Sequence, residues 1–153
     1  MDPRRKLTIR SAVSSDRDAL AVLAQAFLSS SPLTAAADHS PDRVAALVDH
    51  VRSQPNSGVL VVDAGGELLG MLAYLIGLHP VTGLLTLFDI AWFMREDARG
   101  GPEAIELVNQ TAHIGRLHGC VAFHIGAPNA AVLRFLVRAG FEARETTCVM
   151  ELV

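Results

Sequence analysis

The feature that most constrains the fold is residues 84–104, where an apolar run passes through a short charged turn into two glycines and a proline. Residues 84–94 read LLTLFDIAWFM, which has the length and apolar character of a buried strand. The turn REDAR follows, and then Gly100, Gly101 and Pro102. Proline is favoured at the first position of a helix, because its missing N–H would be unpaired there anyway. The pattern therefore predicts a strand that leads through a glycine loop into a helix beginning at Pro102.

A glycine loop at a helix N-terminus is a potential receptor for phosphate. The first N–H groups of a helix have no partner within the helix, and they lie at the positive end of its dipole. Two arginines flank the loop at positions 95 and 99. Arg95 has two readings, a contact with a bound phosphate or a solvated side chain in a charged turn.

Hydrophobic periodicity predicts the remaining elements. A half-buried strand is expected at Leu7–Arg10, followed by helices at Asp16–Leu28 and from Pro41 to about Arg52. Three strands in an antiparallel meander are expected next, at Gly58–Val62, Leu68–Leu78 and Leu84–Met94. After the helix at Pro102 come a strand at Cys120–Ile125, a helix at Asn129–Ala139 and one or two strands within Phe141–Val153.

This order, β-α-α-β-β-β-α-β-α-β-β, predicts an α/β fold of the α+β type. We expect a mixed, mostly antiparallel sheet of six to seven strands flanked by about four helices. The strand at Cys120–Ile125 follows a strand and a helix, so it should pair in parallel with Leu84–Met94 through a crossover. A length of 153 residues favours a single domain over 1–153.

Composition excludes several classes of function. A net charge of −3 without a Lys/Arg stripe argues against nucleic acid as a partner. The longest apolar run, residues 68–78, is too short and too interrupted by glycine to span a membrane. Cys120 and Cys148 lie in strand-like contexts and are expected to be buried, reduced thiols; a nucleophile or a disulfide is the alternative reading. No apolar core follows the basic N-terminus, so we expect a cytoplasmic protein.

Asp89 is the first candidate for chemistry, because it is the lone carboxylate of an otherwise apolar strand. Such a group must be ion-paired, hydrogen-bonded or functional. Asp89 and Trp92 are three residues apart, so a regular strand would direct their side chains to opposite faces, and a bulge would change that. The structural alternative is an Asp89 that pairs with a neighbouring arginine or lies on an exposed face.

His124 and Tyr74 are weaker candidates. His124 lies on the strand after the loop helix, and a packed or surface histidine is the plainer reading. Tyr74, the only tyrosine, lies on the long second strand of the meander, where a core or rim aromatic is the plainer reading. His113 and His118 have no acidic or cysteine partner at metal-ligand spacing, so no metal site is expected.

Two motifs resemble the GNAT family of acetyl-CoA-dependent N-acyltransferases, and with the order of elements the resemblance covers essentially the whole chain. Arg99-Gly100-Gly101-Pro102-Glu103-Ala104 is similar to the family pattern Arg/Gln-x-x-Gly-x-Gly/Ala, with Pro102 in place of the central glycine. The second motif is similar to the family's Asn-x-x-Ala-x-x-Leu-Tyr-x-x-x-Gly-Phe. It matches at Asn129, Gly140 and Phe141, but the tyrosine position is Leu136.

The resemblance implies an enzyme that uses acetyl-CoA, or another acyl-CoA, to acylate an amine of a small molecule or peptide. In that reading, the backbone of Phe93 and Met94 pairs with the pantetheine arm at the place where two strands splay apart. The pyrophosphate contacts are expected from Arg99, Gly100, Gly101 and Ala104, and a further cofactor contact from Asn129. Asp89 is then the expected general base, with His124 as the alternative base and Tyr74 as a substitute for the missing acid. Exposed sheet edges in this fold suggest a homodimer.

A second reading keeps the fold and removes the chemistry. Pro102 removes one amide donor to the pyrophosphate, and Leu136 cannot protonate a leaving thiolate. Both favour a GNAT-fold acyl-CoA-binding or regulatory module with little or no catalysis.

Overall fold

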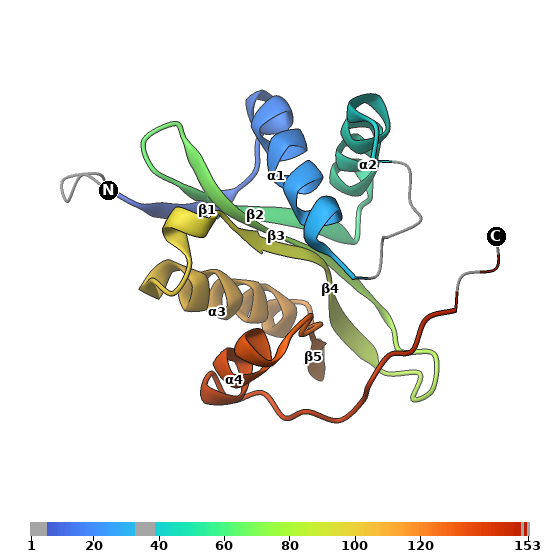
Figure 1. The fold of residues 1–153 in the computed structure, drawn as a ribbon. Helices are drawn as coiled ribbons and strands as arrows, with labels where there is room; N and C mark the ends of the chain where they lie inside the picture. Colours follow the sequence, from blue (N-terminus) through green and yellow to red (C-terminus); the bar gives the residue numbers. More distant parts are fainter. Residues whose placement is uncertain (1–5, 33–38, 151, 153) are drawn as a thin grey trace.

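The computed structural model describes residues 6–32, 39–150 and 152. The chain forms a sheet with helices on both faces (Figure 1). Its elements in order are β1 (Thr8–Ser11), η1 (Ser14–Asp16), α1 (Arg17–Ser30), α2 (Pro41–Ser53), β2 (Ser57–Asp63), β3 (Leu68–Leu78), β4 (Leu85–Met94), η2 (Glu96–Ala98), α3 (Pro102–Leu117), β5 (Ala122–His124) and α4 (Ala130–Arg138). The predicted start of the loop helix at Pro102 and the bounds of β3 agree with the structure.

The sheet has the strand order β1-β2-β3-β4-β5. Strands β1 to β4 are antiparallel neighbours, and β5 pairs in parallel with β4. The predicted meander and the predicted crossover through α3 are therefore confirmed.

The predicted number of strands is wrong, because the sheet within the described residues has five strands instead of six or seven. Residues 141–150, which were expected to supply the last strands, contain no strand. The physical reason lies in the edge that they would have to join. β5 is only three residues long, and residues 142–150 are exposed and include an Arg144–Glu142 ion pair that faces solvent.

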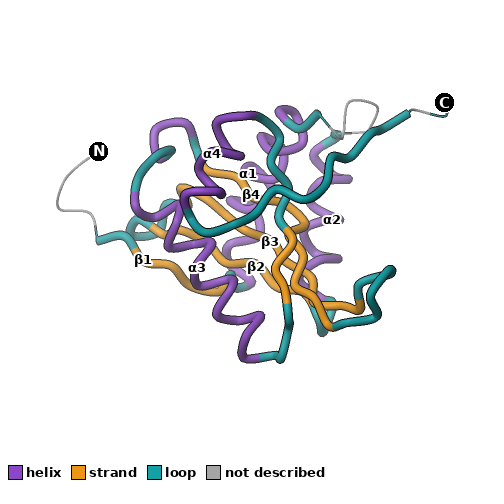
Figure 2. The backbone as a smooth tube through the Cα atoms, turned by 90° about the horizontal axis from the view of Figure 1, so that it is seen from below, coloured by secondary structure: helices purple, strands orange, loops and turns teal. Residues whose placement is uncertain are grey.

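Helices cover the two faces of the sheet in pairs. α1 and α2 lie on one face, and α3 and α4 lie on the other (Figures 1 and 2). Two apolar cores result. The core beneath α1 and α2 contains Leu20, Val44, Val61 and Met71, and the core beneath α3 contains a second set of buried side chains. That second set includes Leu60, Val62, Leu72, Met94, Leu107 and Val108.

The edge of the sheet at β1 is fixed by one arginine that contacts two aspartates. Arg10 donates from Nη1 and Nη2 to the two carboxylate oxygens of Asp16, at 2.7 and 3.0 Å, and from Nε to Asp63 at 2.9 Å. Asp16 also accepts the N–H of Val13, and Asp63 accepts the N–H of Gly66 in the β2–β3 turn. The cluster therefore joins β1, the start of α1 and the β2–β3 hairpin.

No helix within residues 6–32 and 39–150 is both long enough and apolar enough to cross a membrane.

Candidate active site

Strands β4 and β5 separate halfway along β4. The parallel pairing joins Thr86, Leu87 and Phe88 to Ala122, Phe123 and His124, and it ends there. β4 continues to Met94, so its residues 89–94 have β3 on one side and no strand on the other. This uncovered edge of β4 is called the gap below.

The hydrogen bonds of β4 show which backbone groups face the gap. Arg95 donates its N–H to Leu69 of β3, so the groups of Met94 point away from β3. Consistent with this, the Met94 carbonyl accepts a hydrogen bond from Arg99 Nε at 3.0 Å. Trp92 lies two residues earlier and has the same orientation as Met94, whereas the groups of Phe93 face β3. Of the two residues predicted to pair with pantetheine, only Met94 therefore presents its backbone to the gap, and Trp92 takes the place of Phe93.

A β-bulge in β4 changes the face on which Asp89 lies. Ala91 pairs with Ala73 and Asp89 pairs with Tyr74, so Ile90 has no partner on β3. Tyr74 and Trp92 both pack against the core beneath α3. Since cross-strand partners share a face, the bulge brings Asp89 and Trp92 to the same face despite their odd spacing.

Asp89 has no cationic partner among the residues that the structure describes. Its Oδ1 accepts the backbone N–H of Gly126, just beyond β5, at 3.1 Å. Burial raises the pKa of Asp89 from 3.8 to about 6, and the hydrogen bond from Gly126 partly opposes that rise. A carboxylate with this pKa is ionised at neutral pH and is a stronger base than an exposed aspartate.

Tyr74 lies on the same face as Asp89, but its hydroxyl points the other way. A Cβ added at Gly58 of β2 would overlap the end of the Tyr74 ring, so the ring extends across β2. β3 and β4 therefore separate the hydroxyl from the gap. Burial raises the pKa of Tyr74 above its ordinary value. This geometry does not bring Tyr74 together with the other predicted catalytic residues.

His124 belongs to a cluster of three rings. Its ring centroid lies 4.9 Å from that of His79 and 5.4 Å from that of Phe88. Phe88 and Asp89 are consecutive in β4, so the cluster and the Asp89 carboxylate lie on opposite faces of the strand. His124 is exposed, as the plainer reading expected.

The glycine loop has the backbone geometry that the sequence predicts. Gly100 has a φ of +77°, a conformation that favours glycine, and Gly101 is the N-cap residue of α3 with an ordinary φ of −78°. Within the described residues, the N–H groups of Gly100, Gly101 and Glu103 have no hydrogen-bond partner. The N–H of Ala104 donates to Gly101 at 3.3 Å and its methyl group is buried, so Ala104 is the least accessible of the predicted phosphate contacts.

Glu103 lies against the same loop. A Cβ added at Gly101 would overlap the Glu103 carboxylate, so this carboxylate is folded back over the helix N-terminus. There it interacts favourably with the helix dipole and occupies space that an external phosphate would use. The sequence placed Glu103 near the loop and did not reveal this contact.

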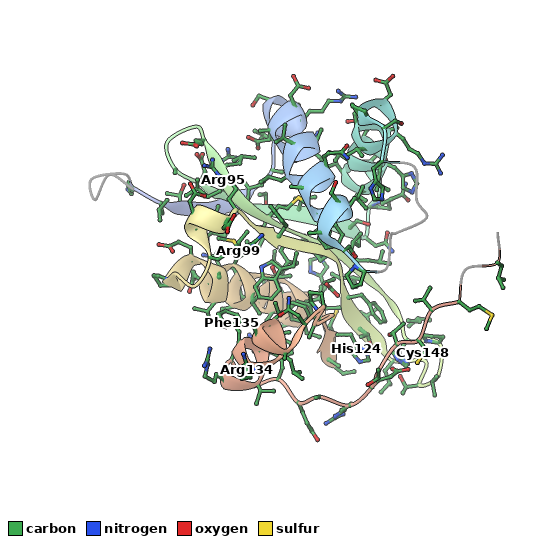
Figure 3. The ribbon with its side chains drawn as sticks, in the orientation of Figure 1. Arg95, Arg99, His124, Arg134, Phe135 and Cys148 are labelled. Atoms are coloured by element: carbon green, nitrogen blue, oxygen red, sulfur yellow. The ribbon has the colours of Figure 1, made fainter. Side chains whose placement is uncertain are left out.

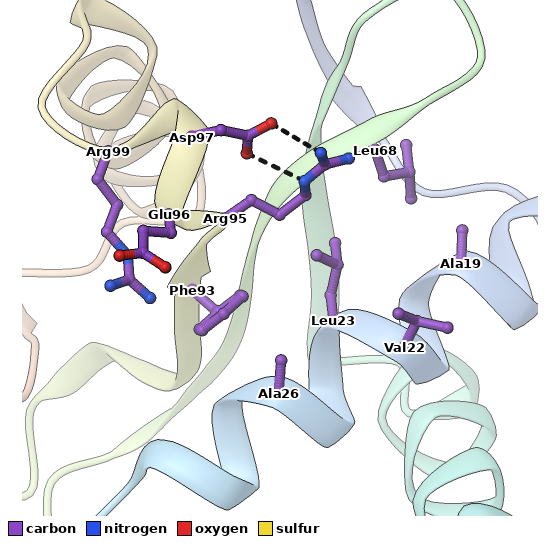
Figure 4. A pocket seen from close by; sticks show the side chains of 10 residues that line it. All are labelled: Ala19, Val22, Leu23, Ala26, Leu68, Phe93, Arg95, Glu96, Asp97 and Arg99. Atoms are coloured by element: carbon purple, nitrogen blue, oxygen red, sulfur yellow. Dashed lines mark hydrogen bonds and ion pairs between the residues drawn. The ribbon is translucent and has the colours of Figure 1, made fainter.

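The two arginines of the loop differ in their availability. Arg95 is ion-paired with Glu67 and Asp97, which supports neither a free cation nor a phosphate contact (Figure 4). Arg99 is held through Nε, and its guanidinium lies 5.5 Å from the centre of the Phe93 ring. Its two terminal nitrogens have no partner among residues 6–32 and 39–150. Arg99 is therefore the cation that the loop offers to a ligand.

Arg99 and Phe93 face a groove of about 820 Å³ between α1 and the end of β4 (Figure 4). One wall consists of small and apolar side chains of α1, and the other carries the charged turn. The lining residues of α1 are Ala19, Val22, Leu23 and Ala26. The contribution of α1 carried no recognisable signal in the sequence, since its outward residues look like an ordinary helix surface.

The face of α4 near the gap is apolar. Asn129 accepts the N–H of Val132 at 3.0 Å, so its side chain caps α4, which leaves its amide N–H groups for other contacts. Phe135 packs on Trp92 with ring centroids 5.6 Å apart (Figure 3 locates Phe135). Leu136 is buried in the core, so this position offers neither a hydroxyl nor an open path to the gap.

Thiol and metal chemistry have no assembled site here. Both cysteines are free; Cys120 is partly buried and Cys148 is exposed, so the predicted burial is wrong for Cys148. No group of three or more His, Cys, Asp and Glu side chains that could hold a metal occurs in the described parts of the chain.

Comparison with known proteins identifies the family. The sequence profile of the Acetyltransferase (GNAT) family matches residues 23–141. The chain therefore belongs to the acetyltransferase (GNAT) family. No curated protein sequence matches the chain.

Solved structures show the same fold at low identity. An aminoglycoside N-acetyltransferase, AAC(6')-Iy, in complex with CoA is 17% identical with a TM-score of 0.79, and the match covers 99% of this chain and 98% of that one. A transcriptional regulator from Bacillus halodurans is 20% identical with a TM-score of 0.77, covering 96% and 100%. A glucosamine-6-phosphate N-acetyltransferase from Arabidopsis thaliana is 14% identical with a TM-score of 0.75, covering 97% and 99%.

Proposed function

We propose that the protein is an N-acetyltransferase that transfers an acyl group from acetyl-CoA, or another acyl-CoA, to an amine of a small molecule or peptide. The observation that carries the proposal is the uncovered edge of β4, which has Asp89 at one end and a helix N-terminus with free N–H groups at the other. Family membership and the CoA-bound neighbour support the same ligand.

Each part of an acyl-CoA has residues that suit it. The pyrophosphate is assigned to the N–H groups of Gly100 and Gly101 and to the guanidinium of Arg99. The pantetheine arm is assigned to the backbone groups of Trp92 and to the N–H of Met94, which would pair with it as an added strand. Asn129 is assigned a contact through its free amide N–H groups.

Asp89 is assigned the role of general base. It takes a proton from the acceptor ammonium, directly or through water, so that the neutral amine can attack the thioester carbonyl. A C–N bond forms, the C–S bond breaks and the thiolate leaves. No described side chain beside the gap is placed to protonate the thiolate, so solvent supplies that proton. A thiolate is a tolerable leaving group near neutral pH, so catalysis does not require an acid at position 136.

The alternative is an acyl-CoA-binding or regulatory module with little or no catalysis. Two observations favour it: the buried Leu136 on α4, and the Glu103 carboxylate folded over the phosphate loop. It predicts acetyl-CoA binding without product.

The first test is calorimetric titration of acetyl-CoA into the protein and into two loop variants. Gly101 suits this design because its φ is ordinary and the nearest obstacle is the flexible end of Glu103. We expect micromolar binding by the parent and by Gly101→Ala, and none by Gly101→Glu, which adds a carboxylate at the phosphate position. The absence of binding to the parent protein would refute both readings.

The second test separates the two readings. The protein is incubated with acetyl-CoA and a panel of amines, including aminoglycosides, amino sugars and peptides, and release of free thiol is followed. Acetylated product supports the enzyme, and binding without product from any amine supports the module.

We also propose that the chain forms a homodimer and acts in the cytoplasm. The outer edge of β5 is open within the described residues, and the segment after α4 exposes Val149 and Met150. These are surfaces that a second copy would cover. Light scattering of the full chain and of a chain ending at residue 144 tests the dimer, which the truncation should dissociate.

A further inference from the structure

The indole N–H of Trp92 is a buried donor without an acceptor. Its Nε1 is inaccessible to solvent and has no hydrogen-bond partner in the parts of the chain that the structure describes. Buried N–H groups are almost always paired, because an unpaired one loses its hydrogen bond to water and gains nothing. An indole N–H is a donor only, so what it lacks is an acceptor.

The surroundings of Trp92 supply no such acceptor. Its ring packs on Phe135 and against the core beneath α3, whose members include Leu72 and Met94. The nearest ionisable side chain along β4 on this face, Asp89, uses Oδ1 for Gly126, which lies beyond the end of β5.

The position of Trp92 shows where an acceptor would come from. Trp92 lies on the strand edge that faces the gap, two residues before Met94 and three residues after Asp89. On the function proposed above, the pyrophosphate lies beyond Met94 and the thioester lies near Asp89. The middle of the pantetheine arm, which carries its two amide groups, then passes Trp92.

We propose that the Nε1–H of Trp92 donates a hydrogen bond to an amide carbonyl of the pantetheine arm, and that it is a positioning residue for the acyl donor. This inference rests on the proposed function. The N–H is covered in this structure, so the indole must shift slightly toward the gap when the arm enters. Because the donor is unpaired beforehand, the shift loses no hydrogen bond. The result is a contact specific to the arm, since nucleotides without pantetheine do not reach it.

The chain offers a direct spectroscopic test, because Trp92 is its only tryptophan. A ¹H–¹⁵N correlation spectrum of the full chain therefore contains a single indole resonance. We expect addition of CoA to move its proton downfield, as formation of a hydrogen bond does, and 3′,5′-ADP to leave it in place. A downfield shift with both ligands, or with neither while CoA binds, would overturn the proposal.

Variants supply an independent measurement. Trp92→Phe keeps an aromatic ring against Phe135 and removes the N–H. We expect it to weaken CoA binding about tenfold, the effect of one net hydrogen bond, and to leave binding of 3′,5′-ADP unchanged. The matched control is Arg99→Leu, which should weaken both ligands. An equal effect of Trp92→Phe on both ligands would show a structural role and refute the assignment.

The failure of this inference is distinguishable from the failure of the proposed function. If CoA does not bind the parent protein at all, the proposed function fails and takes the inference with it. If CoA binds and neither the indole resonance nor Trp92→Phe responds to the arm, only the assignment of Trp92 fails. Since the spectrum is recorded on the parent protein, the test does not depend on the variant's folding.

Discussion

The N–H of Gly126 donates to Oδ1 of Asp89 at 3.1 Å, and this bond lies where β4 and β5 begin to separate. One partner is the residue next to the bulge of β4, and the other follows the end of β5. The bond therefore fixes the inner end of the gap and orients the carboxylate. It also leaves one oxygen of Asp89 without a hydrogen bond among the described residues, which a base requires.

The activity should depend on ionised Asp89. Since its pKa is raised to about 6, we expect kcat/KM to fall as pH decreases through that value, the range in which the base becomes protonated. Asp89→Asn should lower kcat by roughly 10² to 10³ and remove this limb of the profile. Rates of acetyl transfer between pH 5 and 8 test this. A His124→Gln variant is the control, and a profile that follows His124 instead would contradict the assignment.

The same carboxylate should reduce stability. Its folded-state pKa lies above the ordinary 3.8, so the folded protein binds more protons than the unfolded chain between about pH 4 and 6, and stability falls as pH rises through that window. Asp89→Asn should therefore raise the free energy of unfolding by about 1 kcal/mol at pH 8 and by little at pH 4. This is less than the roughly 3 kcal/mol that the pKa difference corresponds to, because the new amide N–H groups also need partners. Urea denaturation at both pH values measures it, and a less stable variant at pH 8 would indicate a structural role.

Glu103 should weaken binding of the phosphate. Its carboxylate is folded over Gly101 at the N-terminus of α3, so Glu103→Gln removes a negative charge from the position assigned to the pyrophosphate. We expect the dissociation constant of CoA to fall about threefold to tenfold at low salt, and the gain to shrink as salt screens the charge. Glu106→Gln is the control, since Glu106 lies further along α3 and pairs with Gln110. An unchanged dissociation constant for Glu103→Gln at low salt would argue that the phosphate binds elsewhere.

The sequence predicts the elements of this site better than their contacts. The apolar run, the glycines and Pro102 were enough to locate β4, the loop and α3, because each is encoded locally. The final strands were predicted from the apolar character of residues 141–153, but pairing also needs a partner edge, and β5 is too short to provide one. The bulge at Ile90, the fold-back of Glu103 and the direction of the Tyr74 hydroxyl depend on register and packing across strands. A one-residue change in register exchanges the faces, and the sequence carries no local signal for it.

Tyr74 gives a prediction in which the expected result is little change. Its hydroxyl lies over Gly58, with β3 and β4 between it and the gap. We expect Tyr74→Phe to keep kcat within about twofold, since a residue that only packs contributes no proton transfer. The measurement is kcat with saturating acetyl-CoA. A loss comparable to that of Asp89→Asn would show that the hydroxyl reaches the substrates after all.

Arg10 should be the charged side chain on which the stability of the fold depends most. Removing it leaves Asp16, which is 8% exposed, and Asp63 without their cation. We expect Arg10→Ala to lower the free energy of unfolding by about 2 kcal/mol at pH 7, below the value of about 3 to 5 kcal/mol for a fully buried pair, because Arg10 is partly exposed. Arg10 holds the pKa of Asp16 below its ordinary value, with the Val13 N–H assisting, so this stabilisation is present above about pH 4 and is lost as pH falls through the lowered pKa. Wild type and variant should therefore converge in strong acid. Arg17→Ala is the matched control, because the Arg17–Asp49 pair is exposed and should matter little. Equal losses in the two variants would show that the cluster at β1 is no more than another surface ion pair.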